Sequence, residues 1–215
     1  MRAGQWQAGD QEMLAVMDAG YDVTRLAWVL RDLPVELVGR LRSDRVLRVP
    51  PRPLSFTYQP RGRPPKHGPE LRLAKPETWP VPALVTLNDT ERYGKAQAQA
   101  WDRVHPRLTH RSSWLDHDGE LPLVEGTLIR LKVDRLPEDR DAPPLWLWSS
   151  KTGATTTDVD QAWSCYLRRF DLEHTIRCFK QDLGWTHPRL RNPLAADRWT
   201  WLVIVTHTQL RLAAP

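Results

Sequence analysis

Four polar residues in the C-terminal third of the chain have types and spacings that could act together on an anionic substrate. Tyr166, Arg169, Glu173 and Lys180 follow one another at intervals of three, four and seven residues. On an α-helix, at about 100° per residue, their side chains fall within about 60° of one another. An aromatic hydroxyl, a guanidinium, a carboxylate and an ammonium then form one narrow ridge. A solvated helix face carries charges at similar spacings, so the pattern alone leaves both interpretations open.

An aspartate near the start of the chain follows an apolar strand. Met13–Met17 is a continuous apolar run, typical of a strand buried on both faces, and Asp18 comes directly after it. Asp22 can cap a helix over about 23–33, and residues 35–39 then form a second strand. Such a strand–helix–strand unit favours parallel pairing. Asp18 then lies at the carboxyl end of a parallel strand, where open α/β sheets bind ligands, although many aspartates simply begin a turn.

The rest of the chain predicts a β-rich middle and two C-terminal helices. A long helix is expected over 158–183, with one of Thr155, Thr156 and Thr157 at its start and Gly184 just past its end. A last helix is expected from about 195 to 212. The segment 94–107 fits no single element. Short strands are expected at 83–87, 123–133 and 145–149.

Length and composition limit the class of protein. The chain has 215 residues, of which 40% are hydrophobic and 27% charged, so it can bury a core. No run approaches the roughly 18 apolar residues of a membrane helix, and the start of the chain lacks the apolar region of a signal peptide. Cys165 and Cys178 fit neither a zinc spacing nor a disulfide framework. We therefore expect a cytoplasmic protein with reduced thiols and no membrane partner.

The positive charge is concentrated in one segment. Gly39–Lys75 contains ten basic and two acidic residues, a charge of +8, whereas the whole chain has a charge of +5. Seven of the 19 prolines also lie there, which excludes a helix or a central strand and predicts an extended arm. Such an arm suits a phosphate backbone. A solvated linker is the alternative, and a GC-rich genome would also explain the excess of arginine over lysine.

Within this arm, Arg61-Gly62-Arg63-Pro64 resembles the core of an AT-hook. In that motif two arginines flank a glycine and lie along a narrow, electronegative minor groove. We expect Arg61, Arg63 and the neighbouring Lys66 to bind DNA, although four residues also fit a plain basic turn.

The pattern Tyr-x2-Arg-x3-Glu-x6-Lys of residues 166–180 resembles the signature of a large group of bacterial insertion-sequence transposases with a DDE active site. Asp18, in the context Asp-x-Gly-Tyr, resembles the second acid of that family. Residues 145–150 resemble the strand that precedes its glutamate-bearing helix. The Gly-Arg-Pro-Pro-Lys segment is similar to that of actinobacterial-type members, and the likeness extends over most of the chain.

The resemblance implies a fold and a division of the chain. The implied fold class is α/β, a partial ribonuclease H-like core (its C-terminal half) with a β-rich insertion. Residues 1–44 would supply core strands, residues 45–150 the insertion with its basic arm, and residues 151–215 the C-terminal helices. Trp101 and Trp114 of the insertion could stack on an unpaired base, with core packing as the alternative.

The resemblance also implies the chemistry. Asp18 and Glu173 would be the catalytic carboxylates and would bind Mg²⁺ or Mn²⁺, which prefer hard oxygen ligands. Two such metals would activate water or a DNA 3′-hydroxyl for attack on a phosphodiester. Tyr166, Arg169 and Lys180 would hold DNA phosphates near the scissile bond. The implied partners are double-stranded DNA, as transposon ends and target, and a second copy of the chain, in association with the bacterial nucleoid.

The family's first catalytic aspartate has no counterpart here. Only 17 residues precede Asp18, and neither Asp10 nor Glu12 ends an apolar strand. The sequence therefore predicts an N-terminally truncated fragment that has no strand-transfer activity by itself. Two functions stay open. One is the C-terminal catalytic portion of a DDE transposase, and the other is a catalytically inactive remnant that only binds DNA through residues 39–75.

Overall fold

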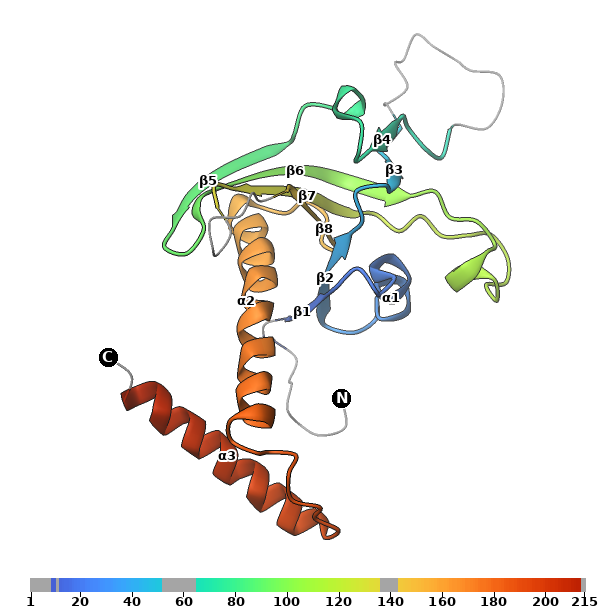
Figure 1. Cartoon of the computed structure of the whole chain (residues 1–215). Helices are drawn as coiled ribbons and strands as arrows, with labels where there is room; N and C mark the ends of the chain where they lie inside the picture. The colour runs from blue at the N-terminus through green and yellow to red at the C-terminus, as the bar shows by residue number, and fades with distance from the viewer. Residues whose placement is uncertain (1–8, 11, 52–64, 136–142, 214–215) are drawn as a thin grey trace. The chain divides into compact units, whose positions relative to one another are not determined.

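The computed structural model describes residues 9–10, 12–51, 65–135 and 143–213 (Figure 1). It divides into two compact units, Met1–Tyr166 and Leu167–Pro215. The division predicted from the resemblance, at residues 44 and 150, stays a prediction.

The described residues form a mixed α/β structure that is mostly sheet. The helices are α1 (Val23–Val29), α2 (Thr156–Gln181) and α3 (Pro193–Ala213), with two 3₁₀ turns, η1 (Pro76–Thr78) and η2 (Ser112–Trp114). None of the helices in the described ranges is both long and apolar enough to cross a bilayer. The strands are β1 (Met13–Met17), β2 (Val35–Leu41), β3 (Val46–Arg48), β4 (Glu70–Arg72), β5 (Leu84–Thr90), β6 (Gly94–Pro106), β7 (Gly126–Val133) and β8 (Leu145–Ser149).

The eight strands belong to one sheet. Its order is β1-β2-β8-β7-β6-β3-β4, and β5 pairs with β6. β1 and β2 are parallel, with Met17 opposite Gly39, and the other pairings are antiparallel. Because α1 connects the parallel pair, the predicted strand–helix–strand unit is confirmed.

Local hydrogen bonds explain where α1 begins. Asp22 Oδ1 accepts hydrogen bonds from the backbone N–H of Arg25, at 3.0 Å, and from Thr24 Oγ1, at 2.7 Å. This is the predicted N-cap, and it satisfies a backbone donor that the first helical turn leaves without a partner. The helix ends at Val29 rather than near residue 33, so it is shorter than the sequence predicts.

β1 is an edge strand, contrary to the expectation of a strand buried on both faces. None of its five residues is fully buried, and Met13 is 44% exposed. The physical reason is its place in the sheet order, since β2 is its neighbour on one side and no described strand lies on the other.

Part of the basic segment belongs to the sheet. β3 lies between β6 and β4, so the exclusion of a central strand is wrong for Val46–Arg48. The three residues of β3 include no proline, and Pro50 and Pro51 follow only after Val49, so the prolines do not interrupt the ladder.

The segment that fits no single element in sequence is β6, the longest strand. It pairs with β5 and β7, and its alanines 96, 98 and 100 are buried. These buried alanines alternate with glutamines. Because alanine has a low strand propensity, the sequence does not reveal this alternation as a strand. The register shifts between Trp101 and Val104, where Arg103 has a φ of 53°, as in a β-bulge.

Tryptophans make up much of the core of the first unit. Trp101 and Trp114 are each 4% exposed and belong to one buried apolar cluster. The indole N–H of Trp101 donates to the Pro80 carbonyl at 2.7 Å, and that of Trp148 donates to the Val104 carbonyl at 3.0 Å. Trp101 and Trp114 therefore pack in the core and do not form an open surface on which a base could stack.

α2 begins at a reciprocally hydrogen-bonded turn. Thr155 Oγ1 accepts from the backbone N–H of Asp158 at 3.3 Å, and Asp158 Oδ2 accepts from the backbone N–H of Thr155 at 2.8 Å. Lys151 Nζ donates to the other carboxylate oxygen at 2.6 Å. This arrangement is a capping box with an aspartate in the distal position, and it starts the helix within two residues of the predicted start.

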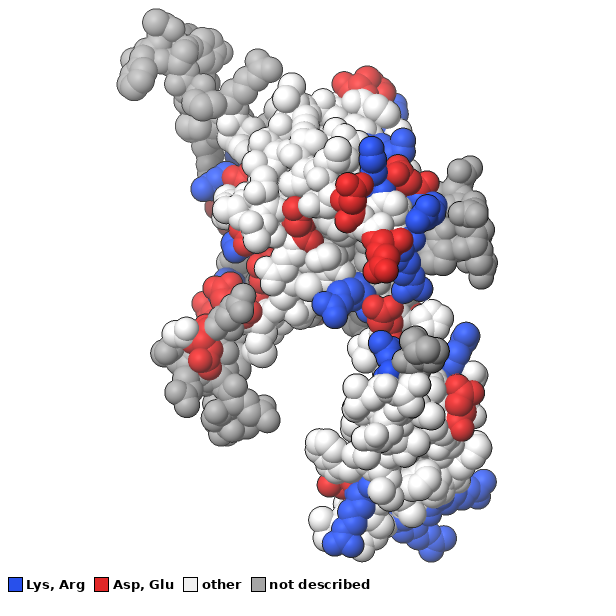
Figure 2. All heavy atoms as spheres, turned by 90° about the vertical axis from the view of Figure 1, so that its left-hand side faces the viewer, with Lys and Arg blue, Asp and Glu red and all other residues white. Residues whose placement is uncertain are grey.

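The second unit comprises the C-terminal part of α2 and the whole of α3. Gly184 has a φ of 65° just past the end of α2, as predicted for a helix stop. The indole N–H of Trp185 donates to Thr200 Oγ1 at 3.0 Å, and that of Trp199 donates to the Trp185 carbonyl at 2.9 Å. In Figure 2 the surface of this unit is largely uncharged toward the viewer, and its Lys and Arg side chains gather at the lower end.

The contact between α1 and β2 depends on a glycine. A Cβ atom at Gly39 would lie 2.6 Å from Val23 Cβ, so Gly39→Ala forces α1 away from the sheet. We expect Gly39→Ala to lower the free energy of unfolding by about 1–3 kcal/mol, measured by urea denaturation. Gly20→Ala is the matched control, because a Cβ there meets nothing within 4 Å. Equal stability of the two variants would contradict this packing.

The turn before α2 makes the free energy of unfolding depend on pH at low pH. Hydrogen bonds from Lys151 and Thr155 lower the pKa of Asp158 from 3.8 to about 2. Because the folded-state pKa lies below the unfolded value, the stabilisation is complete above about pH 4 and disappears as the pH falls through 2. We expect Asp158→Asn to cost on the order of 1 kcal/mol at pH 5 and much less near pH 2, by urea denaturation. A pH-independent cost would show that the carboxylate's charge is not involved.

Candidate functional site

Asp18 occupies the carboxyl end of β1, at the start of a tight turn. Its Oδ1 accepts a hydrogen bond from the backbone N–H of Ala19 at 2.8 Å, and its carbonyl accepts one from the backbone N–H of Tyr21 at 3.2 Å. The side chain is 49% exposed. The turn therefore fixes the carboxylate while leaving it accessible to a substrate.

A tyrosine that is distant in sequence holds this carboxylate. The hydroxyl of Tyr166, on α2, donates to Asp18 Oδ1 at 3.2 Å across 148 positions of the chain. Tyr166 is 2% exposed, so its ring belongs to the core and only its hydroxyl faces the site. The geometry makes Tyr166 a positioning residue for Asp18. The contact between Tyr166 and a DNA phosphate stays a prediction.

Arg40 is a neighbour of Asp18 that the sequence analysis missed as a site residue. Its Nη1 lies 3.9 Å from Asp18 Oδ1, and both side chains are half exposed. Such an ion pair adds little stability, but it provides a positive charge beside the carboxylate. The parallel register pairs Met17 with Gly39, so the next residues on the two strands are Asp18 and Arg40. The predicted strand pair could have identified Arg40 if its register had been assigned.

The described surroundings of Asp18 do not make a metal site. Carboxylate oxygens suit Mg²⁺, and such sites gather several of them. Within the residues that the structure describes, no three His, Cys, Asp or Glu side chains are grouped to hold a metal ion. The described groups that contact Asp18 include a hydroxyl, a backbone N–H and a guanidinium. We therefore assign no metal-dependent step to Asp18 from the structure.

The other predicted signature residues lie in the second unit. Arg169 Nη1 is 3.7 Å from Glu173 Oε1, an i, i+4 pair in which the side chains are 15% and 60% exposed. Lys180 is exposed near the end of α2. Asp18 belongs to the first unit and Glu173 to the second. Their joint catalytic role, and DNA binding by Arg169 and Lys180, stay predictions.

The residues predicted in the basic arm are only partly described. Arg61 and Arg63 lie outside the described residues. Lys66 Nζ donates to Glu120 Oε1 at 3.1 Å and to the Leu121 carbonyl at 2.7 Å, so its ammonium has partners within the protein. DNA binding by these three residues stays a prediction.

The next residue along the chain, His67, lies against a second histidine. Burial, followed by repulsion from His105, Lys66 and Arg107, lowers the pKa of His67. The His67 ring nitrogen Nδ1 lies 3.0 Å from His105 Nε2, which also has a lowered pKa because of burial. Burial is the main cause of both shifts, and it favours the neutral form of both imidazoles.

The contact between Tyr166 and Asp18 can be measured by a double-mutant cycle. We expect Tyr166→Phe to lower the free energy of unfolding and to show a coupling energy of about 1 kcal/mol with Asp18→Ala, because the two groups share one hydrogen bond. Tyr21→Phe is the control, since that side chain is 64% exposed. A coupling energy near zero would show that Tyr166 does not hold Asp18 in solution.

Comparison with known proteins relates the N-terminal part of the chain to a protein family. Residues 1–107 match the family model described as DDE superfamily endonuclease. No curated protein matches the chain. The matched region contains Asp18 and the parallel strand pair, and it ends before α2 and its signature residues. The match supports a DDE transposase-like family, a transposase-type nuclease function and DNA as the substrate.

Proposed function

We propose that this chain acts on DNA as the catalytic portion of a DDE transposase, with Asp18 at its reactive centre. The observation that carries the proposal is the position of Asp18, at the carboxyl end of a parallel strand and within the region that matches DDE superfamily endonucleases. The hydroxyl of Tyr166 holds its carboxylate there. A carboxylate that is fixed but half exposed is suited to act on a bound substrate.

The finer parts of the proposal come from the resemblance of residues 166–180. They comprise a ribonuclease H-like core, ends of an insertion sequence as substrate, and action as a homodimer. They also include Asp18 and Glu173 as ligands of Mg²⁺ or Mn²⁺ in phosphodiester hydrolysis and strand transfer. Tyr166 and Glu173 lie on the same helix, seven residues apart, which supports a functional link between Asp18 and Glu173.

A second function is favoured by one observation. The described residues contain no group of three metal-binding side chains, and DNA binding does not need one. A chain that binds DNA without cutting it would still use the basic segment 39–75. The two functions differ in whether DNA approaches Asp18 and whether a divalent cation acts there.

The experiment measures the affinity of the chain for duplex DNA taken from the native flanks of its gene. Without divalent cations, we expect Asp18→Asn to bind this duplex about threefold more tightly, because it removes a carboxylate that repels phosphates. Asp89→Asn, an exposed carboxylate on β5, is the matched control and should leave the affinity unchanged. Unchanged affinity in Asp18→Asn would place the DNA elsewhere and overturn the proposed centre.

Addition of Mn²⁺ separates the two functions. A catalytic role predicts that Mn²⁺ tightens DNA binding of the original chain and has a smaller effect on Asp18→Asn and Glu173→Gln. Equal effects on all three proteins would favour DNA binding alone. In either case we expect no cleavage of the duplex by this chain by itself, and robust Mg²⁺-dependent cutting that Asp18→Asn abolishes would contradict that expectation.

A further inference from the structure

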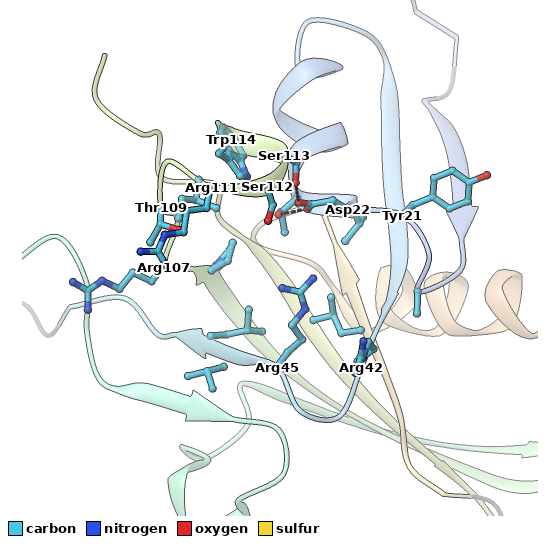
Figure 3. Close-up of a pocket in the computed structure, with 18 of the residues that line it drawn as sticks. Tyr21, Asp22, Arg42, Arg45, Arg107, Thr109, Arg111, Ser112, Ser113 and Trp114 are labelled. Carbon is cyan, nitrogen blue, oxygen red and sulfur yellow. Dashed lines mark hydrogen bonds between the residues drawn. The ribbon is translucent and has the colours of Figure 1, made fainter. Parts of the chain in front are cut away.

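The lining of a cavity in the first unit includes five arginines (Figure 3). Ala19, which directly follows Asp18 in the chain, is part of this lining. The cavity has a volume of about 190 Å³. Its walls come from the turn before α1, the end of β2 with the turn that follows, the end of β6, and η2. The charged residues of its lining are one acid, Asp22, and five arginines: Arg40, Arg42, Arg45, Arg107 and Arg111.

The single acid of the cavity is used by the fold. Asp22 Oδ1 caps α1, and its Oδ2 accepts a hydrogen bond from Ser113 Oγ at 2.5 Å. Burial acts to raise the pKa of Asp22, but the hydrogen bonds from Ser113, Thr24 and the Arg25 backbone, with a smaller effect of the Arg45 charge, outweigh it and the pKa is lowered. Asp22 is therefore ionised, and its oxygens are occupied by the cap and by η2 rather than by a cavity arginine.

Three of the five arginines make no salt bridge to any described residue. They are Arg45, Arg107 and Arg111, whereas Arg42 lies 3.2 Å from Asp44 and Arg40 lies 3.9 Å from Asp18. Figure 3 shows Arg45 extending from the turn after β2 toward the side of the cavity where Asp22 and Ser112 lie. With five arginines and one aspartate, the lining has an excess of positive charge that its own acid neutralises only in part.

The opposite wall of the cavity adds three hydroxyl groups and the buried side chain of Trp114. Thr109, Ser112 and Ser113 line the cavity, and Ser112 has a φ of 51°, a conformation that non-glycine residues rarely adopt. Trp114 is 4% exposed, and the Arg25 guanidinium lies 4.5 Å from the centre of its ring. Guanidinium and hydroxyl groups around one space form a donor set that matches an oxygen-rich anion.

We propose that this cavity binds phosphate groups of a DNA strand, at a site additional to Asp18 and to the residues of the 166–180 signature. The inference rests on the proposed action on DNA. The size of the cavity supports a backbone phosphate, since enclosed sites for whole small molecules have volumes of about 300–1,000 Å³. All five arginines are exposed, so a strand can pass over the opening while one phosphate enters it.

The position of the cavity gives the site a role. Arg40 lines the cavity and also lies beside Asp18, so a strand held by the other arginines is led toward that carboxylate. Phosphate contacts fix the register of a nucleic acid on a protein without reading its sequence. The cavity would therefore determine which phosphodiester reaches Asp18.

The test compares two double variants that remove the same charge. Arg45→Gln/Arg111→Gln removes two cavity arginines, and Arg92→Gln/Lys132→Gln removes two cations outside the cavity lining. We expect the cavity variant to bind the flanking duplex on the order of tenfold more weakly, with a slope of log K against log salt that is smaller by about 2. In the control variant, the change in DNA affinity and the change in the salt slope should each be less than half of those in the cavity variant.

The outcomes separate this inference from the proposed function. Failure of the original chain to bind DNA overturns both, whereas equal losses in the two double variants overturn the cavity site alone. A rise in melting temperature with inorganic phosphate that the cavity variant lacks, together with unchanged DNA affinity, would assign the cavity to free phosphate instead. If the double variant does not fold by circular dichroism, Arg107→Glu alone should still weaken DNA binding, and unchanged affinity in that variant would overturn the proposal.

Discussion

The hydrogen bonding of β2 on both of its edges is the constraint on which the site depends. On one edge it pairs in parallel with β1, and this register places Arg40 beside Asp18. On the other edge it pairs with β8, and Ser150 continues the contact, with its Oγ accepting from the Leu37 backbone N–H at 2.9 Å. The chain then enters α2, which brings Tyr166 to Asp18. Two residues that are 148 positions apart therefore meet because the same strand supports both of them.

The close approach of α1 to β2 sets the other boundary of the site. Gly39 lies opposite Trp148 in the sheet and directly against Val23, where a larger residue would separate helix and strand. The cap residue Asp22 then sits one residue before that contact and reaches Ser113 of η2. The packing of a seven-residue helix thus links the turn at Asp18 to a segment that comes some 90 residues later, and both line the same cavity.

Local signals in the sequence predict the helices and strands that form the site, but they do not predict the contacts between them. The apolar run before Asp18, the Asp22 cap and the threonine before α2 were each sufficient to predict an element, because each acts over a few residues. β6 stayed unassigned because buried alanines alternate with glutamines and a bulge interrupts the period. The contact between Tyr166 and Asp18 could not be predicted, since it depends on pairings across the whole sheet.

The fold also divides the basic residues into two groups that counting along the sequence cannot separate. Arg48 pairs with Glu70 at 2.7 Å and Lys66 with Glu120 at 3.1 Å, so these cations of the basic segment stabilise the sheet and its loops. Arg45 belongs to the same segment but lines the cavity with Arg107 and Arg111, which lie outside it. A solvated linker explains the charge of the segment, but it does not explain why arginines from two distant parts of the chain surround one space. That convergence is a property of the folded structure, and it is the reason to place an anionic partner there.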